Sequence, residues 1–236
     1  MPTQPRMLDE ISTRWPLIHD PAQFVLRYGP AIEGYLAALV RDPDLVDEIR
    51  QDFLVRVLQK GFGPEGNVKG RFRHYLKAAV RNTALTHWRR KVPRPVDPGL
   101  LAQVPAEDSD ALEREWLDRW RRCVLERVWE ALELHERRHP DNHAHTVLRA
   151  FVEHAADEDS AQLAERVSGR LRKPLRADAF RKQLSRARRL FAELLIQEVR
   201  QTLENPDPER VEEELADVGL LAEIRPFLPD DWREQL

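Results

Sequence analysis

Residues 70–91 read GRFRHYLKAAVRNTALTHWRRK and contain no carboxylate. Nine lysines and arginines lie between Lys69 and Arg94, although the formal net charge of the whole chain is −3. On a helical wheel, one face is apolar and is expected to be buried: Phe72, Leu76, Ala79, Val80 and Thr83. A second, cationic face carries Arg73, Lys77, Arg81 and Trp88. A basic helix with interleaved aromatic rings suits single-stranded nucleic acid, because cations follow phosphates and rings stack on bases.

The composition of the whole chain predicts an all-α fold. Only 9 of 236 residues are glycine, and the 17 prolines mark breaks between amphipathic segments. The first helical block begins near Pro21 and is expected to be kinked or divided at Gly29-Pro30. The next helix follows Asp42-Pro43-Asp44, and its apolar stripe is Leu45, Ile49, Phe53, Val57 and Leu58. A long helix is expected from about Leu112 to His139, and a short one around residues 147–152.

Composition and charge divide the chain into two small helical domains joined by a flexible linker. The expected parts are an N-terminal segment (1–20), a first domain (21–92), an acidic linker (93–111), a second domain (112–203) and an acidic C-terminal extension (204–236). Residues 166–190 hold ten Lys or Arg and one acid, whereas residues 204–236 hold eleven Asp or Glu and three Arg. Two roles stay open for the acidic extension: Glu212, Glu213 and Glu214 could compete with DNA for a basic surface, or the extension could be a helix that serves only solubility.

The second domain has the outline of a helix-turn-helix DNA-binding unit. Ser160 is a candidate N-cap for a helix over residues 161–167, a loop extends to Arg176, and a long helix runs from Asp178 to about Leu203. The apolar stripe of this last helix is Phe180, Leu184, Ala187, Phe191, Leu194 and Leu195. Its other face, which we expect to reach a major groove, carries Arg181, Lys182, Ser185, Arg186 and Arg189.

Three segments together resemble the extracytoplasmic-function (ECF) sigma factors, the two-domain specificity subunits of bacterial RNA polymerase. Residues 46–58, VDEIRQDFLVRVL, are similar to the polymerase-binding helix of that family, with Arg50 replacing an apolar residue and Leu54 replacing Phe. Residues 70–90 are similar to the promoter-opening helix. Residues 180–188, FRKQLSRAR, contain the family's Leu-Ser-Arg-Ala-Arg hallmark. The loop before this last helix is longer than the usual turn, and residues 201–236 extend beyond the usual end.

The resemblance implies a sigma factor that directs polymerase core to promoters and helps to open the DNA. It implies polymerase contacts by Asp47, Glu48, Gln51, Asp52 and Arg56. It implies contacts to unwound promoter DNA by Asn67, Lys69, Arg71, Arg73, Lys77, Arg81, Trp88 and Arg89. Duplex DNA would meet Arg172, Lys173, Arg176, Arg181, Lys182, Ser185, Arg186 and Arg189, of which the first three are candidates for phosphate contacts. The expected partners are polymerase core, promoter DNA and an inhibitory anti-sigma protein, without a cofactor, a metal or catalytic activity.

Three other functions stay open on the sequence alone. A helix-turn-helix regulator that never contacts polymerase would form dimers on palindromic sites, and a helical RNA-binding protein would use the same basic-aromatic chemistry. A metal-dependent enzyme would draw ligands from the cluster His135, His139, His143 and His145, of which the first two share a helical face. The chain contains no His-Glu-x-x-His, Gly-rich phosphate loop or Gly-x-Ser-x-Gly motif.

The expected location is the cytoplasm, without membrane attachment. Cys123 is the single cysteine, which suits a reducing compartment. No apolar run approaches the ~20 residues that span a bilayer, and residues 1–6 lack the apolar core of a secretory signal.

Overall fold

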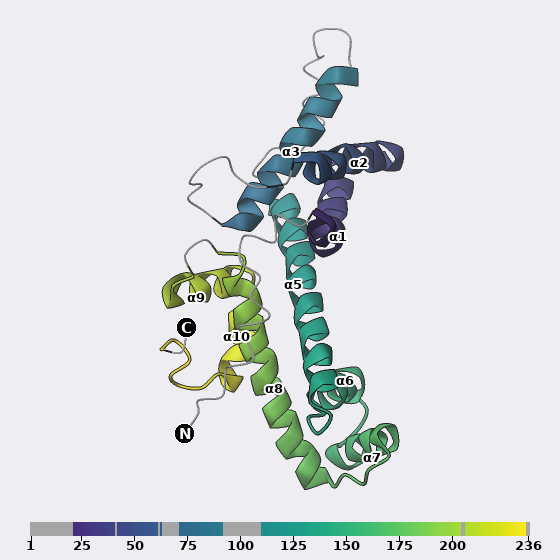
Figure 1. The fold of residues 1–236 in the computed structure, drawn as a ribbon, viewed down its shortest axis with the longest axis vertical. Helices are drawn as coiled ribbons and strands as arrows, with labels where there is room; N and C mark the ends of the chain where they lie inside the picture. The colour runs from purple at the N-terminus through teal and green to yellow at the C-terminus, as the bar shows by residue number, and fades with distance from the viewer. Residues whose placement is uncertain are drawn as a thin grey trace. The chain divides into compact units, whose positions relative to one another are not determined.

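The computed structural model describes residues 21–40, 42–60, 62, 71–91, 110–203 and 206–234. Every named element within these ranges is helical, which confirms the all-α class (Figure 1). The elements are α1 (Pro21–Leu39), α2 (Pro43–Lys60), α3 (Phe72–Lys91), α5 (Asp110–Arg138), α6 (Ala144–His154), α7 (Ser160–Leu171), α8 (Ala177–Arg200), α9 (Pro208–Asp217), α10 (Leu221–Ile224) and the 3-10 helix η3 (Arg225–Phe227). The expected N-terminal segment and residues 93–109 of the expected linker lie outside the described residues. Among those described, no helix combines the length and the apolar character needed to cross a membrane.

The chain forms two compact units, and helix α5 contributes to both. Unit 1 comprises the residues up to Cys123 together with Arg200–Pro206, and unit 2 comprises Val124–Val199 and the residues from Asp207 onward. The division therefore falls inside α5, whereas the sequence analysis places the start of the second domain at residue 112.

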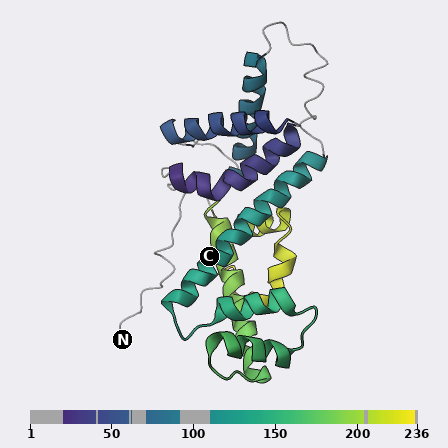
Figure 2. The same cartoon turned by 90° about the vertical axis from the view of Figure 1, so that its right-hand side faces the viewer.

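The core of unit 1 is an aromatic cluster between α1, α2 and α3, which lie against one another in both views (Figures 1 and 2). The Phe24 ring lies 4.9 Å from that of Phe62 and 6.4 Å from that of Phe53. Helix α1 continues through Pro30 as one helix, so of the two expected alternatives, a kink or a division, the division is excluded. Proline removes one intrahelical hydrogen bond, to the carbonyl of Leu26. Leu26 is 73% exposed, so water can satisfy that carbonyl.

The first turns of α5 complete unit 1. The indole of Trp120 stacks on the ring of Tyr28 with an interplanar angle of 4° and a centroid distance of 5.5 Å. Trp116 meets Tyr35 edge-on at 5.4 Å. Both tryptophans are at most 1% exposed. Helices α1 and α5 are so close that a Cβ added to Gly34 would lie 2.9 Å from Cγ of Arg119.

In unit 2, α7 and α8 are joined by residues 172–176, a shorter connection than the expected loop over residues 168–176. Helix α7 is capped by Asp159 rather than by Ser160, because the Asp159 carboxylate accepts hydrogen bonds from the backbone of Ala161 and Gln162. The helix continues past Gly169 to Leu171, since Ser168 fixes the last turn: its hydroxyl donates to the Ala164 carbonyl at 2.7 Å and accepts from the Leu175 amide at 2.8 Å. The connection is therefore five residues long, slightly longer than the three to four residues typical of a helix-turn-helix turn.

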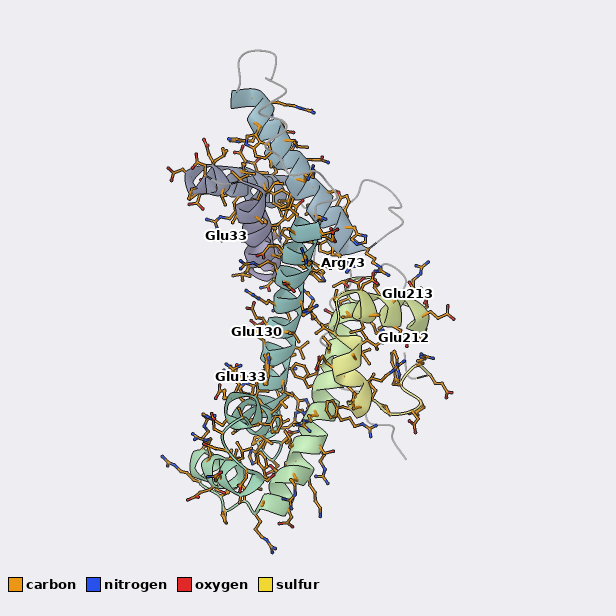
Figure 3. The ribbon with its side chains drawn as sticks, turned by 180° about the vertical axis from the view of Figure 1, so that it is seen from behind. Glu33, Arg73, Glu130, Glu133, Glu212 and Glu213 are labelled. Atoms are coloured by element: carbon orange, nitrogen blue, oxygen red, sulfur yellow. The ribbon has the colours of Figure 1, made fainter. Side chains whose placement is uncertain are left out.

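The acidic C-terminal extension folds as part of unit 2. Its apolar residues Val211, Leu215 and Val218 are buried. Glu212, which projects from α9 (Figure 3), forms ion pairs with Arg225 and Arg233 inside the extension. Glu214 is 2% exposed. Of the three carboxylates expected to compete with DNA, Glu212 is therefore paired within the extension and Glu214 is buried, which does not support that hypothesis.

Candidate nucleic-acid and polymerase-binding surfaces

The outer face of α8 presents a cluster of exposed cations. Its apolar residues Phe180, Leu184 and Ala187 are buried, which fixes the rotation of the helix. The exposed side carries the predicted duplex-binding residues Arg181, Lys182, Ser185, Arg186 and Arg189. Among the described residues, Arg181, Lys182 and Arg186 have no ion-pair or hydrogen-bond partner, whereas Arg189 Nε bonds Glu193 at 3.1 Å. Three cations on this face are therefore available to an anionic ligand.

The connection before α8 adds three more exposed cations, Arg172, Lys173 and Arg176. Arg176 Nε lies 3.3 Å from the carboxylate of Asp178, and its side chain is 89% exposed. Arg172 ends α7 in the left-handed conformation with φ 52°, as the single non-glycine residue with positive φ in the described part of the chain. Glycine is the usual residue at such a cap. An arginine at a position that favours glycine motivates the hypothesis that its side chain has a function.

Replacing Arg172 with glycine is expected to stabilise the fold by about 1 kcal/mol, because glycine removes the steric penalty of the left-handed conformation. The same change is expected to weaken duplex DNA binding and to lower the slope of log K against log salt by about one phosphate contact. Urea unfolding and fluorescence anisotropy over a salt series measure the two effects. The matched control is Lys173→Ala, which should lower the slope without a gain in stability. An unchanged slope for Arg172→Gly would contradict the assignment.

Arg188 lies two residues after Arg186 but does not join the exposed cationic face. Its guanidinium lies over the ring of Phe151 on α6, at 4.3 Å, and over that of Phe227 on η3, at 5.1 Å. The two cation–π contacts tie the C-terminal extension to α6 and α8. Sequence analysis missed this role because the partner ring lies 39 residues further along the chain, and no local pattern signals such a contact.

The polymerase-binding residues expected on α2 differ in exposure, and several of them have partners within unit 1. Asp47, Glu48 and Gln51 are exposed, and Asp52 and Arg56 are half-buried. The carboxylates of Glu48 and Asp52 each lie 3.4 Å from a ring nitrogen of His87 on α3. Arg50, which replaces an apolar residue of the family pattern, bonds Asp47 at 3.0 Å and lies 3.6 Å from Glu33.

Two apolar residues extend the exposed face of α2. Val55 is 46% exposed and Leu58 is 53% exposed. They continue the line of Asp47 and Gln51 at helical spacing. The expectation that Leu58 belongs to the buried stripe with Val57 is wrong, because adjacent residues on a helix point about 100° apart. The exposed face of α2 therefore combines acidic, amide and apolar groups.

The cationic face expected on α3 is largely enclosed within unit 1. Arg89 is exposed, whereas Arg71, Lys77, Arg81 and Trp88 are half-buried. Arg73, labelled in Figure 3, is only 3% exposed, so its guanidinium is not accessible to a DNA phosphate in this structure. Lys77, with a side chain 16% exposed, forms an ion pair with Glu113 of α5. Asn67 and Lys69 lie outside the described residues.

The histidine cluster forms the corner between α5 and α6. The rings of His135 and His139 stack at 4.4 Å. Asn142 Nδ2 donates to His135 Nε2 at 3.1 Å, and His139 Nδ1 donates to the His135 carbonyl at 2.9 Å. His145 packs edge-on against Trp129. In the described part of the chain, no group of three His, Cys, Asp or Glu side chains could hold a metal ion.

Burial, followed by the neighbouring His139, lowers the pKa of His135 below its ordinary value of 6.5. Near pH 6 the folded state therefore binds fewer protons at this site than the unfolded state does. The stabilisation that neutral His135 contributes is complete above pH 6.5 and is lost as the pH falls below that value. We expect an NMR titration of His135 to give a midpoint below 6.5. The His135→Gln variant, whose amide can still accept from Asn142, should show a smaller loss of stability between pH 7 and 5. A midpoint above 6.5 would contradict the geometry of this corner.

Comparison with known proteins adds no family to these observations. The chain matches no protein-family model, no curated protein and no solved structure. The assignment of function therefore depends on the surfaces described above and on the three sequence motifs.

Proposed function

We propose that this protein is a sigma factor of the ECF type, which brings bacterial RNA polymerase core to specific promoters and helps to open the DNA. The observation that carries the proposal is the exposed cationic face of α8. The helix follows a five-residue connection after α7, its apolar side is buried, and Arg181, Lys182 and Arg186 have no partner among the described residues. A buried apolar side and an exposed cationic side support the proposal, because they suit a helix that enters a major groove.

In this proposal the exposed face of α2 contacts polymerase. Val55 and Leu58 supply apolar area at one end of this face, and Asp47 and Gln51 supply polar groups at the other. Interfaces between proteins combine an apolar centre with a complementary polar rim, and acidic groups suit a basic partner. Helix α3 would contact the opened strand through Arg89 and through the half-buried Trp88, whose ring could stack on a base.

A test of this proposal measures complex formation between the full chain and purified bacterial core polymerase. The wild-type protein is expected to form a stable stoichiometric complex on gel filtration. The double variant Val55→Arg/Leu58→Arg should lose it, because two charges would be placed in the apolar part of the interface. The matched control is Val152→Arg, which alters a residue 61% exposed on α6 in unit 2 and should bind core normally. Absence of any complex with the wild-type protein would refute the polymerase-binding role.

One observation favours a second candidate, a DNA-binding regulator that acts without polymerase. Arg73 is buried and Lys77 is paired with Glu113, so much of the α3 face is not free for opened DNA in this structure. A regulator of this kind would bind duplex DNA through α8 and would not associate with core. The gel-filtration experiment therefore separates the two candidates.

A further inference from the structure

We propose that the first turns of α5, residues 110–123, are an internal competitor of single-stranded nucleic acid for the α3 face of unit 1. The proposal rests on the proposed function and adds regulation to it: opened DNA and α5 would occupy the same face in turn. The α3 helix carries the cations and lies beside aromatic residues of α1, and α5 covers both.

The charge contact has the chemistry of a phosphate contact. Glu113 of α5 places its carboxylate on the ammonium group of Lys77 in α3. The ammonium group also lies 5.9 Å from the ring centroid of Tyr35 on α1. A backbone phosphate is the other common anionic partner for a lysine beside an aromatic ring in a nucleic-acid groove. Glu113 therefore occupies the position that an incoming phosphate would need.

The ring contacts have the chemistry of base stacking. Trp120 lies parallel to Tyr28 at 5.5 Å, and it also approaches Phe72 at 6.1 Å. Trp116 packs edge-on against Tyr35. Proteins that bind single strands without sequence preference present aromatic rings beside cations, because every base can stack on such a ring. The two indoles of α5 fill the aromatic faces of α1 and α3 that bases would otherwise use.

The contact between α5 and α1 also includes polar groups that would gain from separation. The Tyr35 hydroxyl and the Trp116 indole N–H are both buried without a hydrogen-bond partner among the described residues. A buried polar group without a partner destabilises the state that buries it, and it recovers hydration when exposed. Burial of the two indoles holds α5 in place, whereas these two groups favour its release. In this proposal the two unsatisfied groups lower the cost of releasing α5, and binding of the competing ligand supplies the rest.

The first test weakens the charge contact without altering the core. Glu113 is 42% exposed, so Glu113→Gln removes its charge and keeps its shape. The full-length variant is expected to bind a fluorescent single-stranded oligothymidylate at low salt about two- to fivefold more tightly than wild type. The matched control is Glu115→Gln, which removes a carboxylate paired with Arg119 on the same helix and should leave this affinity unchanged. Equal or weaker binding by Glu113→Gln would overturn the proposal.

The second test locks the cover with a disulfide between α1 and α5. The added Cβ at Gly34 would lie 2.9 Å from Cγ of Arg119, a position that the sulfur of a cysteine introduced there could take, so the two positions are close enough to be bridged. We therefore combine Gly34→Cys and Arg119→Cys with Cys123→Ala, so that the engineered pair has no native competitor. The oxidised protein is expected to bind the oligothymidylate at least about tenfold more weakly than the reduced protein.

Duplex DNA binding through α8 is the internal control, and it should be the same in both redox states. Equal binding of the single strand by the oxidised and reduced forms would overturn the proposal, as would a failure of both forms to bind it. Neither result depends on polymerase. If the protein fails to bind core but shows redox-dependent single-strand binding, the sigma-factor role would be refuted. The proposal that α5 competes with single-stranded nucleic acid for the α3 face would still be supported.

Discussion

Replacing Arg186 with alanine is expected to weaken binding to a cognate duplex by about 1–3 kcal/mol, the discrimination given by one good arginine–base contact. Arg186 is exposed in the middle of the outer face of α8 and has no partner among the described residues, so its loss leaves the fold unchanged. The cognate duplex is one selected by the wild-type protein from a random pool, and anisotropy gives the affinity. The loss should be accompanied by relaxed preference at one or two base pairs.

Arg188 provides the matched control for Arg186 within the same helix. Its guanidinium lies between Phe151 and Phe227, so Arg188→Met is expected to lower the stability of unit 2. At a temperature where the variant is folded, its duplex affinity and base preference should equal those of wild type. If Arg188→Met reduced DNA affinity as strongly as Arg186→Ala while leaving stability intact, the assignment of the reading face would be wrong.

The second large effect is expected from Trp120→Ala, which should destabilise the protein by about 3–5 kcal/mol. Trp120 is 1% exposed and contacts the rings of Tyr28, Phe72 and Trp116, so truncation removes the centre of an aromatic cluster. Urea unfolding monitored by circular dichroism measures the loss.

The control for Trp120 lies on the same helix. Leu134 is 38% exposed, and Leu134→Ala should change stability by no more than about 0.5 kcal/mol, as most surface substitutions do. A loss below about 1 kcal/mol for Trp120→Ala would mean that the first turns of α5 do not belong to the core of unit 1.

The parts of the fold that sequence predicts well are those decided by local periodicity. The stripe of Phe180, Leu184 and Ala187 is buried as expected, and the five polar residues predicted on the other face of α8 are exposed. A helix with a single apolar stripe can bury only that stripe, so its outer face follows from the wheel.

Helix α3 shows what helical periodicity alone does not predict. Phe72, Leu76 and Val80 are buried as predicted, but Arg73 is buried too, and Lys77 is held by Glu113. Periodicity tells which residues share a face and does not tell whether a distant segment covers a second face. The contact depends on α5, which the composition assigns to a different domain because an acidic, proline-containing stretch precedes it.

Contacts made outside the helix concerned explain two further corrections. The apolar residues of the acidic extension are buried in unit 2, and its Phe227 packs on Arg188, although its composition suggests a solvated tail. Helix α7 ends at Leu171 because the Ser168 hydroxyl bonds the Leu175 backbone across the turn. Neither contact can be predicted from the hydrophobic periodicity of the sequence around it.

The central claim is that this chain gives core polymerase a promoter specificity that is read by α8. Its most direct test is transcription by purified bacterial core polymerase from a pool of random-sequence duplexes, with sequencing of the transcript ends. With the wild-type protein we expect initiation at discrete positions downstream of a shared motif, and with Arg186→Ala we expect this initiation to fall to the level of core alone. Initiation no more selective than that of core alone with the wild-type protein, or equal selectivity with the variant, would contradict the claim.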